Sequence, residues 1–252
     1  MKGLTLCARS TISSCTLLAV LFCAPGASAA SLRVGVNSGW MMPFAQIDSG
    51  LPTNGIVVDL YRAVAADLGL RLQPLMLPRK RIEQLELDGK IDFSCYANRA
   101  WTLAPDEFVW SDPLFEITDV LVGHRDTPNP GNTKGVPSSA ILSTVLGYVY
   151  PSLEDQFAAG RLRREDTQDQ NKVLLKVSAN RTAYGITNSQ SLSWFRRSES
   201  AHALADWHVV IDRADFYCSV PKRGAIPAAR IIGVLRSMKK DGRIERILRS
   251  YR

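Results

Sequence analysis

The chain of 252 residues has little of what marks an enzyme or a metalloprotein. Its five cysteines form no Cys-x-x-Cys pair, and its three histidines, His124, His202 and His208, lack the spacing of metal ligands. It contains no Gly-x-Ser-x-Gly, no His-Glu-x-x-His and no glycine-rich loop that would cradle a phosphate. We therefore expect no metal ion and no cofactor, and these absences argue against enzymatic activity.

Long runs of basic residues are also absent, as are long apolar runs after residue 30. The formal net charge is +7, but no basic run interleaved with aromatic residues occurs, which argues against nucleic-acid binding. Beyond residue 30, no apolar stretch approaches the roughly 20 residues of a transmembrane helix. The mature protein is therefore not expected to span a membrane or to move a solute across one by itself.

The first 29 residues are predicted to be a signal peptide. They begin with the basic Lys2, continue with a short apolar run at 16–24 and end in the small-residue motif Ala-Ser-Ala at 27–29. We expect cleavage there, so that the mature protein begins at Ala30 or Ser31 in the periplasm. Removing 29 of the 252 residues leaves 223, enough for one bilobal unit or two small domains.

Cysteine usage is consistent with export. A lipoprotein would use Cys23 as its anchor, but the bulky Phe22 stands where a small residue is expected, which favours soluble export. Three of the five cysteines leave with the signal, and Cys95 and Cys218 remain as an even pair in an oxidising compartment. They form either a disulfide or two buried free thiols.

Strand and helix signals alternate after residue 31, which predicts an α/β protein with mostly parallel sheets. Residues 56–68 form the clearest helix, because their apolar side chains share one face and Gly69 follows as a stop. Strands are expected at 33–36, 70–77, 91–96, 141–149, 184–187 and 216–220, a surface loop at 127–139, and C-terminal helices around 231–238 and 244–248.

Five pieces of sequence follow one another in a characteristic order. They are Leu-Arg-Val-Gly-Val at 32–36, Trp-Met-Met-Pro-Phe at 40–44, the helical segment 55–70, Leu-Asp-Gly-Lys-Ile-Asp at 87–92 and Trp-Ser-Asp-Pro-Leu-Phe at 110–115. In this order, behind an export signal, the chain resembles the extracytoplasmic solute-binding proteins of family 3, the receptors of polar amino-acid ABC importers. The resemblance extends over nearly the whole chain after residue 31.

The resemblance implies an α/β, two-lobed periplasmic-binding-protein type II fold, with two crossings between the lobes and a cleft between them. It also makes the strands of Cys95 and Cys218 neighbours, so a disulfide that ties the two halves of lobe 1 together is expected. The implied boundaries are lobe 1 at 30–117, lobe 2 at 118–212 and a return segment of lobe 1 at 213–252, with crossings near 116–118 and 211–213.

Ligands of open α/β sheets bind beyond the carboxyl ends of the strands, and this rule selects the candidate site. The cleft expected there has aromatic walls, amide and hydroxyl groups, and guanidinium groups that suit a carboxylate. Asn37 and Arg79 also follow strands, but Arg79 is interpreted as solvated. The predicted ligand-binding residues are Trp40, Phe44, Arg81, Tyr96, Asn98, Arg99, Trp101, Tyr150, Ser152 and Asn188.

Several of these residues have a purely structural alternative. Trp40 and Phe44 either line the site or cap the core of lobe 1. Arg81 either contacts the ligand or neutralises an acid on its own helix. Ser152 either binds the ligand or caps a helix. Asp119, near the crossing, carries no mark of a catalytic acid.

The chain departs from the family pattern at two positions. Members that bind amino acids usually carry an arginine where Ala104 stands here, and Arg99 is the nearest residue that can replace it as the partner of an anion. They also carry an acid where Asn188 stands here, and an amide offers an ammonium a hydrogen bond but no charge. The identity of the ligand is therefore left open.

The function implied is periplasmic binding of a small polar solute, an amino acid or a related small acid, by a monomer that delivers it to an ABC-type permease. Two alternatives stay open. One is a ligand-sensing module for a membrane signalling partner. The other is a dehydratase-like enzyme on the same fold, which would need a positioned acid in the cleft.

Overall fold

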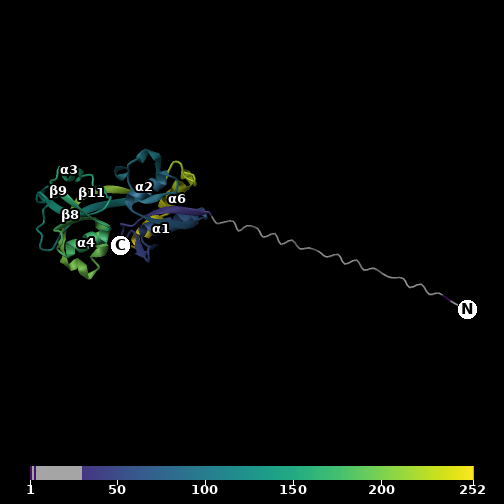
Figure 1. The fold of residues 1–252 in the computed structure, drawn as a ribbon, viewed down its shortest axis with the longest axis horizontal. Coiled ribbons are helices and arrows are strands. Elements are labelled where there is room, and N and C mark those ends of the chain that lie inside the picture. The colour runs from purple at the N-terminus through teal and green to yellow at the C-terminus, as the bar shows by residue number, and fades with distance from the viewer. Residues whose placement is uncertain (2, 4–29, 252) are drawn as a thin grey trace.

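The computed structural model describes residues 1, 3 and 30–251, and Figure 1 shows two lobes joined by long strands. The predicted signal peptide and the alternative anchor Cys23 lie outside the described residues, apart from positions 1 and 3. Within the described part of the chain, no helix is long and apolar enough to cross a membrane. The same residues contain no group of three or more His, Cys, Asp or Glu side chains that could hold a metal ion.

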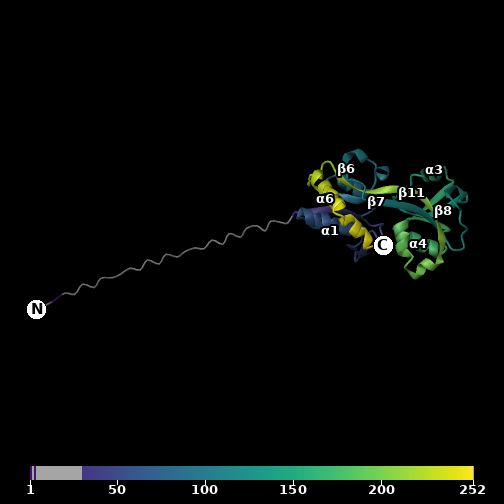
Figure 2. The same cartoon turned by 180° about the vertical axis from the view of Figure 1, so that it is seen from behind.

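Lobe 1 contains both ends of the described segment 30–251, seen as purple-blue and yellow segments side by side in Figures 1 and 2. Its strands β1 and β4 pair in parallel, and a single parallel bridge between Val34 and Phe93 lies next to them. The elements are β1 (Ser31–Asn37), β2 (Gln46–Asp48), β3 (Leu51–Asn54), α1 (Ile56–Leu68), β4 (Arg71–Leu77), α2 (Arg79–Leu87), β5 (Ser94–Ala97), β6 (Phe108–Trp110), α6 (Ala228–Lys240) and α7 (Arg243–Arg249).

Lobe 2 is a sheet with helices on both faces. Val120 and Leu121 follow each other on β7 and therefore point to opposite faces, one packing under α4 and α5 and the other into a cluster that includes Phe157 of α3. Strands β10, β8 and β9 run parallel, and β10 pairs antiparallel with β7. The elements are β8 (Ala140–Val145), α3 (Glu154–Ala158), β9 (Leu162–Thr167), α4 (Gln170–Ser178), β10 (Tyr184–Asn188) and α5 (Ser189–Phe195).

Two long antiparallel strands, β7 (Phe115–His124) and β11 (Leu204–Pro221), run from one lobe into the other. Strand β11 pairs with β5 and β6 in lobe 1, and β7 pairs with β10 in lobe 2, so a single sheet order β5-β11-β7-β10-β8-β9 connects both lobes. The two expected crossings are these strands. The predicted lobe boundaries fall inside β7 and β11 and remain a prediction.

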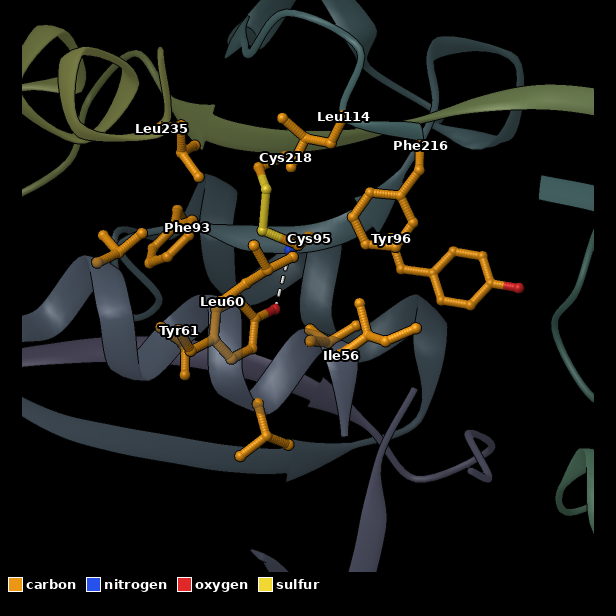
Figure 3. Packing of buried hydrophobic residues seen from close by; sticks show 14 of the residues in the cluster. Ile56, Leu60, Tyr61, Phe93, Cys95, Tyr96, Leu114, Phe216, Cys218 and Leu235 are labelled. Carbon is orange, nitrogen blue, oxygen red and sulfur yellow. Dashed lines mark hydrogen bonds between the residues drawn. A yellow bond between two sulfur atoms is a disulfide. The ribbon is translucent and has the colours of Figure 1, made fainter. Parts of the chain in front are cut away.

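The core of lobe 1 is held together by α1 and by a disulfide (Figure 3). Cys95 on β5 and Cys218 on β11 are opposite each other in register and are joined, with their Cα atoms 3.9 Å apart. The Tyr61 hydroxyl, reaching from α1, donates to the Gly35 carbonyl at 2.7 Å and accepts from the Cys95 N–H at 2.8 Å. The expected pairing of the two cysteines is confirmed, and the free-thiol alternative is wrong.

Two local predictions were wrong in lobe 2. The strand expected at 141–149 ends at Val145, because Gly147 takes a positive φ of 80° and turns the chain toward the cleft. Ser152 does not cap the following helix, which begins at Glu154 after Leu153. Its backbone N–H and hydroxyl instead bond to the carboxylate of Asp212, near the crossing.

Candidate ligand-binding site

A cavity lies between the two lobes, next to the crossing strands. The non-atom space between its lining residues is about 430 Å³, part of which is open solvent, so the room enclosed for a ligand is smaller than this. Lobe 1 contributes three aromatic rings, an amide and a guanidinium, while β7 contributes a carboxyl group and the segment after β8 a phenol. The lining residues are Asn37, Trp40, Arg79, Tyr96, Trp101, Asp119, Gly147, Tyr148 and Val149.

Tyr96 is directed toward lobe 2 by a β-bulge. Cys95 pairs with Cys218 and Ala97 pairs with Tyr217, so Tyr96 is the extra residue between them, and its φ of 62° is unusual for a side chain of this size. Figure 3 shows its ring extending past Phe216, with the hydroxyl at the far end. Strained residues of this kind are concentrated at functional sites, which supports a role for Tyr96 in the cleft.

Tyr96 is also the centre of an aromatic cluster. Its ring stacks with Trp40 at 5.6 Å and with Phe216 at 5.3 Å between centroids, and it lies 4.6 Å from Phe44 and 6.2 Å from Trp101. Burial raises the pKa of the Tyr96 phenol well above its ordinary value, so the group stays neutral. The wall of the cavity on lobe 1 is therefore aromatic, with one hydroxyl at its edge.

Asp119 is the only carboxyl group among the residues that line the cavity. It is half-buried and, among the described residues, its carboxyl group makes no hydrogen bond and no ion pair. Burial, together with the charge of Asp212 opposite it in register, raises the pKa of Asp119 to about 7. An ionised acid shielded from water and without a partner is costly for the folded protein, and a bound cation would relieve that cost.

Arg79, which was interpreted as solvated, is half-buried and lines the cavity, where it supplies the positive charge. It is the first residue of α2, and its only hydrogen bond to the described residues is a long one, 3.5 Å from Nη2 to the Trp101 carbonyl. Most of its five N–H groups are therefore free to bind a ligand. The cavity thus presents a guanidinium, on Arg79, and an acid, on Asp119, which complement the carboxylate and the ammonium of a zwitterion.

The lobes touch directly around this cavity. The Asn37 amide donates to the Tyr148 hydroxyl at 3.3 Å, and the Gln170 N–H donates to the Gly39 carbonyl at 3.2 Å. Deeper in the cleft, the Asn188 amide donates to the Tyr96 hydroxyl at 3.0 Å. The structure therefore represents a closed arrangement, because all three hydrogen bonds run from one lobe to the other.

Of the ten predicted ligand-binding residues, Trp40, Tyr96 and Trp101 line the cavity. Phe44 is fully buried behind Tyr96, and Tyr150 is buried in the core of lobe 2. Asn188 is also fully buried: its oxygen caps α5 through the Ser191 N–H, and its amide nitrogen serves Tyr96 and Gln170. These three residues support the cavity from behind and do not line it.

The other four predicted residues lie elsewhere. Arg81 is exposed, and Arg99 is exposed with its guanidinium 5.3 Å above the Trp110 ring, so neither guanidinium reaches the cavity. Asn98 caps a short 3-10 helix and donates to the Asp215 carbonyl, and the hydroxyl of Ser152 is bound to an aspartate near the crossing. Their role in ligand binding remains a prediction that this placement does not support.

The residues that were missed carried signals in the sequence. Arg79 precedes the buried residues Ile82 and Glu86 of α2 by three and seven positions, so these three side chains share one helical face. Arg81 lies on a different face of the same helix. Asp119 is a single acid inside the apolar strand Ile-Thr-Asp-Val-Leu-Val, an unusual place for a charge. No comparable signal marks Tyr148, because its position depends on where the turn at Gly147 sends the chain.

The fold is that of the two-lobed periplasmic binding proteins, as the sequence predicts. The chain matches no family model and no curated protein. Among solved structures it is similar to ArgBP from T. maritima, with a TM-score of 0.72 and 20% identity over 88% of this chain and 95% of that one.

Two further similar structures illustrate other uses of the fold. One is the ancestral amino acid-binding protein AncCDT-1, a precursor of cyclohexadienyl dehydratase, with a TM-score of 0.71 and 17% identity over 88% of this chain and 95% of that one. The other is a histidine kinase sensor domain with similarity to periplasmic binding proteins, also with a TM-score of 0.71 and 17% identity, over 88% of this chain and 96% of that one. At these identities the likeness establishes the fold alone.

Proposed function

We propose that the protein binds a small polar solute, an amino acid or a related small acid, between its lobes and delivers it to an ABC-type importer in the membrane. The observation that carries this proposal is the pair of opposite charges, Arg79 and Asp119, in one aromatic-walled cavity between the lobes. The similar binding proteins support it, since they have the same two-lobed architecture.

The charges of the cavity argue for a ligand that carries charge itself. The Arg79 guanidinium can bind a carboxylate through two parallel hydrogen bonds, and the Asp119 carboxylate can accept from an ammonium. Both side chains lack an ion-pair partner among the described residues, so a ligand with both groups would satisfy them together. The aromatic wall would exclude water and strengthen these interactions. Arg79 and Asp119 thus take the roles that Arg99 and Asn188 were expected to fill.

Delivery rests on closure of the lobes. A permease can distinguish a loaded from an empty receptor only if ligand binding changes its shape, and hinge closure around a ligand is a common way to do so. The hydrogen bonds of Asn37, Gly39 and Tyr96 to lobe 2 form only when the lobes are together. In this proposal the closed monomer, in the periplasm, is the form that the permease recognises.

A thermal-shift screen of the common amino acids and small carboxylic acids, followed by calorimetry on the ligands found, tests the proposal. A ligand at 100 times its dissociation constant should stabilise the protein by about 2.7 kcal/mol. Arg79→Gln should weaken binding of a carboxylate ligand by about 2–5 kcal/mol, tens to thousands of fold. Arg81→Gln is the matched control, because that guanidinium is exposed on the same helix and lies outside the cavity. Equal losses in both variants, or no ligand at all, would contradict the proposal.

The dependence of affinity on pH tests the role of Asp119. The carboxyl group is ionised above its pKa of about 7 and neutral below it. Affinity for a ligand with an ammonium group should therefore rise as the pH is raised through about 7, and Asp119→Asn should remove that rise. Calorimetry at pH values on either side, with Glu116→Gln as the control on the same strand, measures this. A ligand whose affinity falls over the same range would show that Asp119 does not bind a cation.

A second candidate function is favoured by the same raised pKa. An acid that holds its proton near neutral pH can protonate a leaving group, as a dehydratase of small cyclic acids requires, and Asp119 is the only carboxyl group among the residues that line the cavity. Incubation with prephenate-like acids, followed by mass spectrometry, separates the two: loss of both water and carbon dioxide from the substrate supports the enzyme, and unchanged bound ligand supports the receptor. A sensing role would be indicated by a signalling gene beside this one, in place of permease and ATPase genes.

A further inference from the structure

The segment after β8 enters the cleft and brings Tyr148 against lobe 1. Gly147, with its φ of 80°, turns the chain, and Tyr148 then lines the cavity opposite the aromatic wall. Its hydroxyl accepts a hydrogen bond of 3.3 Å from the Asn37 amide, across the interface between the lobes. Burial raises the pKa of the Tyr148 phenol above its ordinary range, so the ring stays neutral and its hydroxyl keeps the proton.

Arg164 on β9 holds this segment from behind. Its guanidinium donates to the Tyr148 carbonyl at 3.0 Å and to the Val145 carbonyl at 3.2 Å, bracketing the turn. The same guanidinium pairs with Asp166 at 3.0 Å and lies 5.4 Å above the ring of Tyr150. With its carbonyl tied to the body of lobe 2 and its hydroxyl to lobe 1, Tyr148 is fixed at both ends in the closed arrangement.

The cavity that remains between Tyr148 and the opposite wall is small. The space open to the centre of a water-sized sphere is about 40 Å³, whereas one water molecule needs roughly 10–15 Å³. Trp40, Tyr96 and Trp101 cannot withdraw easily, because they are packed against one another and Tyr96 is tied to Asn188. A long ligand would therefore have to displace the Tyr148 ring or keep the lobes apart.

We propose that Tyr148 sets an upper limit on the length of the ligand and so acts as a specificity-determining residue. This inference rests on the proposed function. The ring occupies space at the edge of the small cavity that a longer ligand would need, and Arg164 holds the backbone carbonyl of Tyr148 in place. Short solutes fit with the Tyr148 ring in place when the lobes close, and longer ones fit only if the ring is displaced.

Two homologous series test the inference: the amino acids glycine, alanine, glutamine and arginine, and the dicarboxylates from malonate to adipate. Calorimetry measures each compound against the parent protein, Tyr148→Ala and Tyr148→Phe. The parent should prefer the short members, and Tyr148→Ala should improve the affinity of long members relative to short ones by about tenfold or more, since a single methylene in a tight pocket can be worth 10- to 200-fold. Tyr148→Phe keeps the ring and should keep the length limit. Tyr217→Ala is the matched control, because that tyrosine does not line the cavity.

The outcomes separate the two proposals. If compounds bind the parent irrespective of their length, or if Tyr148→Ala has the same preference as the parent, the proposed function stands and the role of Tyr148 is refuted. If no compound of either series binds any of the proteins, both proposals are overturned. A preference for short members that Tyr217→Ala abolishes equally would also refute the role of Tyr148.

Discussion

Replacing Glu86 by glutamine should change how the stability of the protein depends on pH. Glu86 lies on the inner face of α2 and is 2% exposed, and its Oε1 accepts hydrogen bonds from the hydroxyls of Ser94 at 2.8 Å and Ser219 at 3.1 Å. Burial raises the pKa of Glu86 from 4.5 to about 8, because two hydroxyl groups do not replace the water that an ionised carboxylate loses.

The direction of the effect follows from where the proton is bound. Below about pH 4.5 the carboxyl group is protonated in both the folded and the unfolded chain. Between 4.5 and 8 only the folded chain keeps the proton, so the free energy of unfolding falls as the pH rises. A pKa difference of about 3.5, at 1.36 kcal/mol per unit, sets an upper bound of about 5 kcal/mol on this fall. Above pH 8 the group adds no further dependence.

Urea unfolding followed by circular dichroism, at about pH 5 and about pH 8.5, measures the fall. Glutamine keeps the shape and the acceptor oxygen but does not ionise. In Glu86→Gln the free energy of unfolding should therefore decrease much less between the two pH values than in the parent, and the variant should be more stable than the parent at the higher pH. Glu83→Gln is the matched control on the same helix. The Glu83 carboxylate accepts from the backbone N–H groups of Leu103 and Ala104. Replacing Glu83 should leave the decrease in the free energy of unfolding between the two pH values in place. If Glu86→Gln retains the fall of the parent, the reasoning about its burial is wrong.

Three further predictions concern the disulfide, the closed arrangement and processing. Replacing Cys95 and Cys218 by alanine should lower the free energy of unfolding by about 4–5 kcal/mol, because the bond closes a loop of 123 residues; an unchanged urea midpoint would contradict this. Asn188→Ala removes the α5 cap and a hydrogen bond between the lobes, so small-angle scattering should show a larger radius of gyration for the unliganded variant, and an equal radius would refute it. Exported protein should begin at Ala30 or Ser31 by N-terminal sequencing, unless a lipid-modified cysteine is found there instead.

Local signals located many of the helices and strands, whereas the two-lobed arrangement was expected only from the family resemblance, and the expectation of mostly parallel sheets was wrong because β11 and β7 pair antiparallel with their neighbours. The helix α1 was predicted from the spacing of its apolar residues and from Gly69, which ends it with a positive φ of 66° as its missing side chain allows. The end of β8 was predicted too late, because the apolar run continues past Val145 into the turn, where Leu146 and Val149 are exposed and Tyr148 lines the cavity. An apolar side chain in an exposed turn cannot be distinguished locally from one buried in a sheet.

The candidate site was predicted less well, for a related reason. Aromatic residues after strands were good candidates, since Trp40, Tyr96 and Trp101 all line the cavity. The guanidinium was assigned to Arg99 because it precedes the Trp-Ser-Asp-Pro segment, but that side chain packs over Trp110 on the outside. Distance along the chain does not determine direction in space, and the helical face of Arg79 was the better guide.

The path of the chain through β7 and β11 makes lobe 2 an insertion with adjacent ends. Thr118 and Arg213 are opposite each other in register although they are 95 positions apart, so a tight hairpin turn joining them would close lobe 1 on its own. Sequences inserted at such neighbouring ends can be exchanged without moving the host domain. The half of the cavity that carries Arg79 and the half that carries Tyr148 can therefore diversify separately in evolution, one by substitution within the host and the other by replacement of the insert.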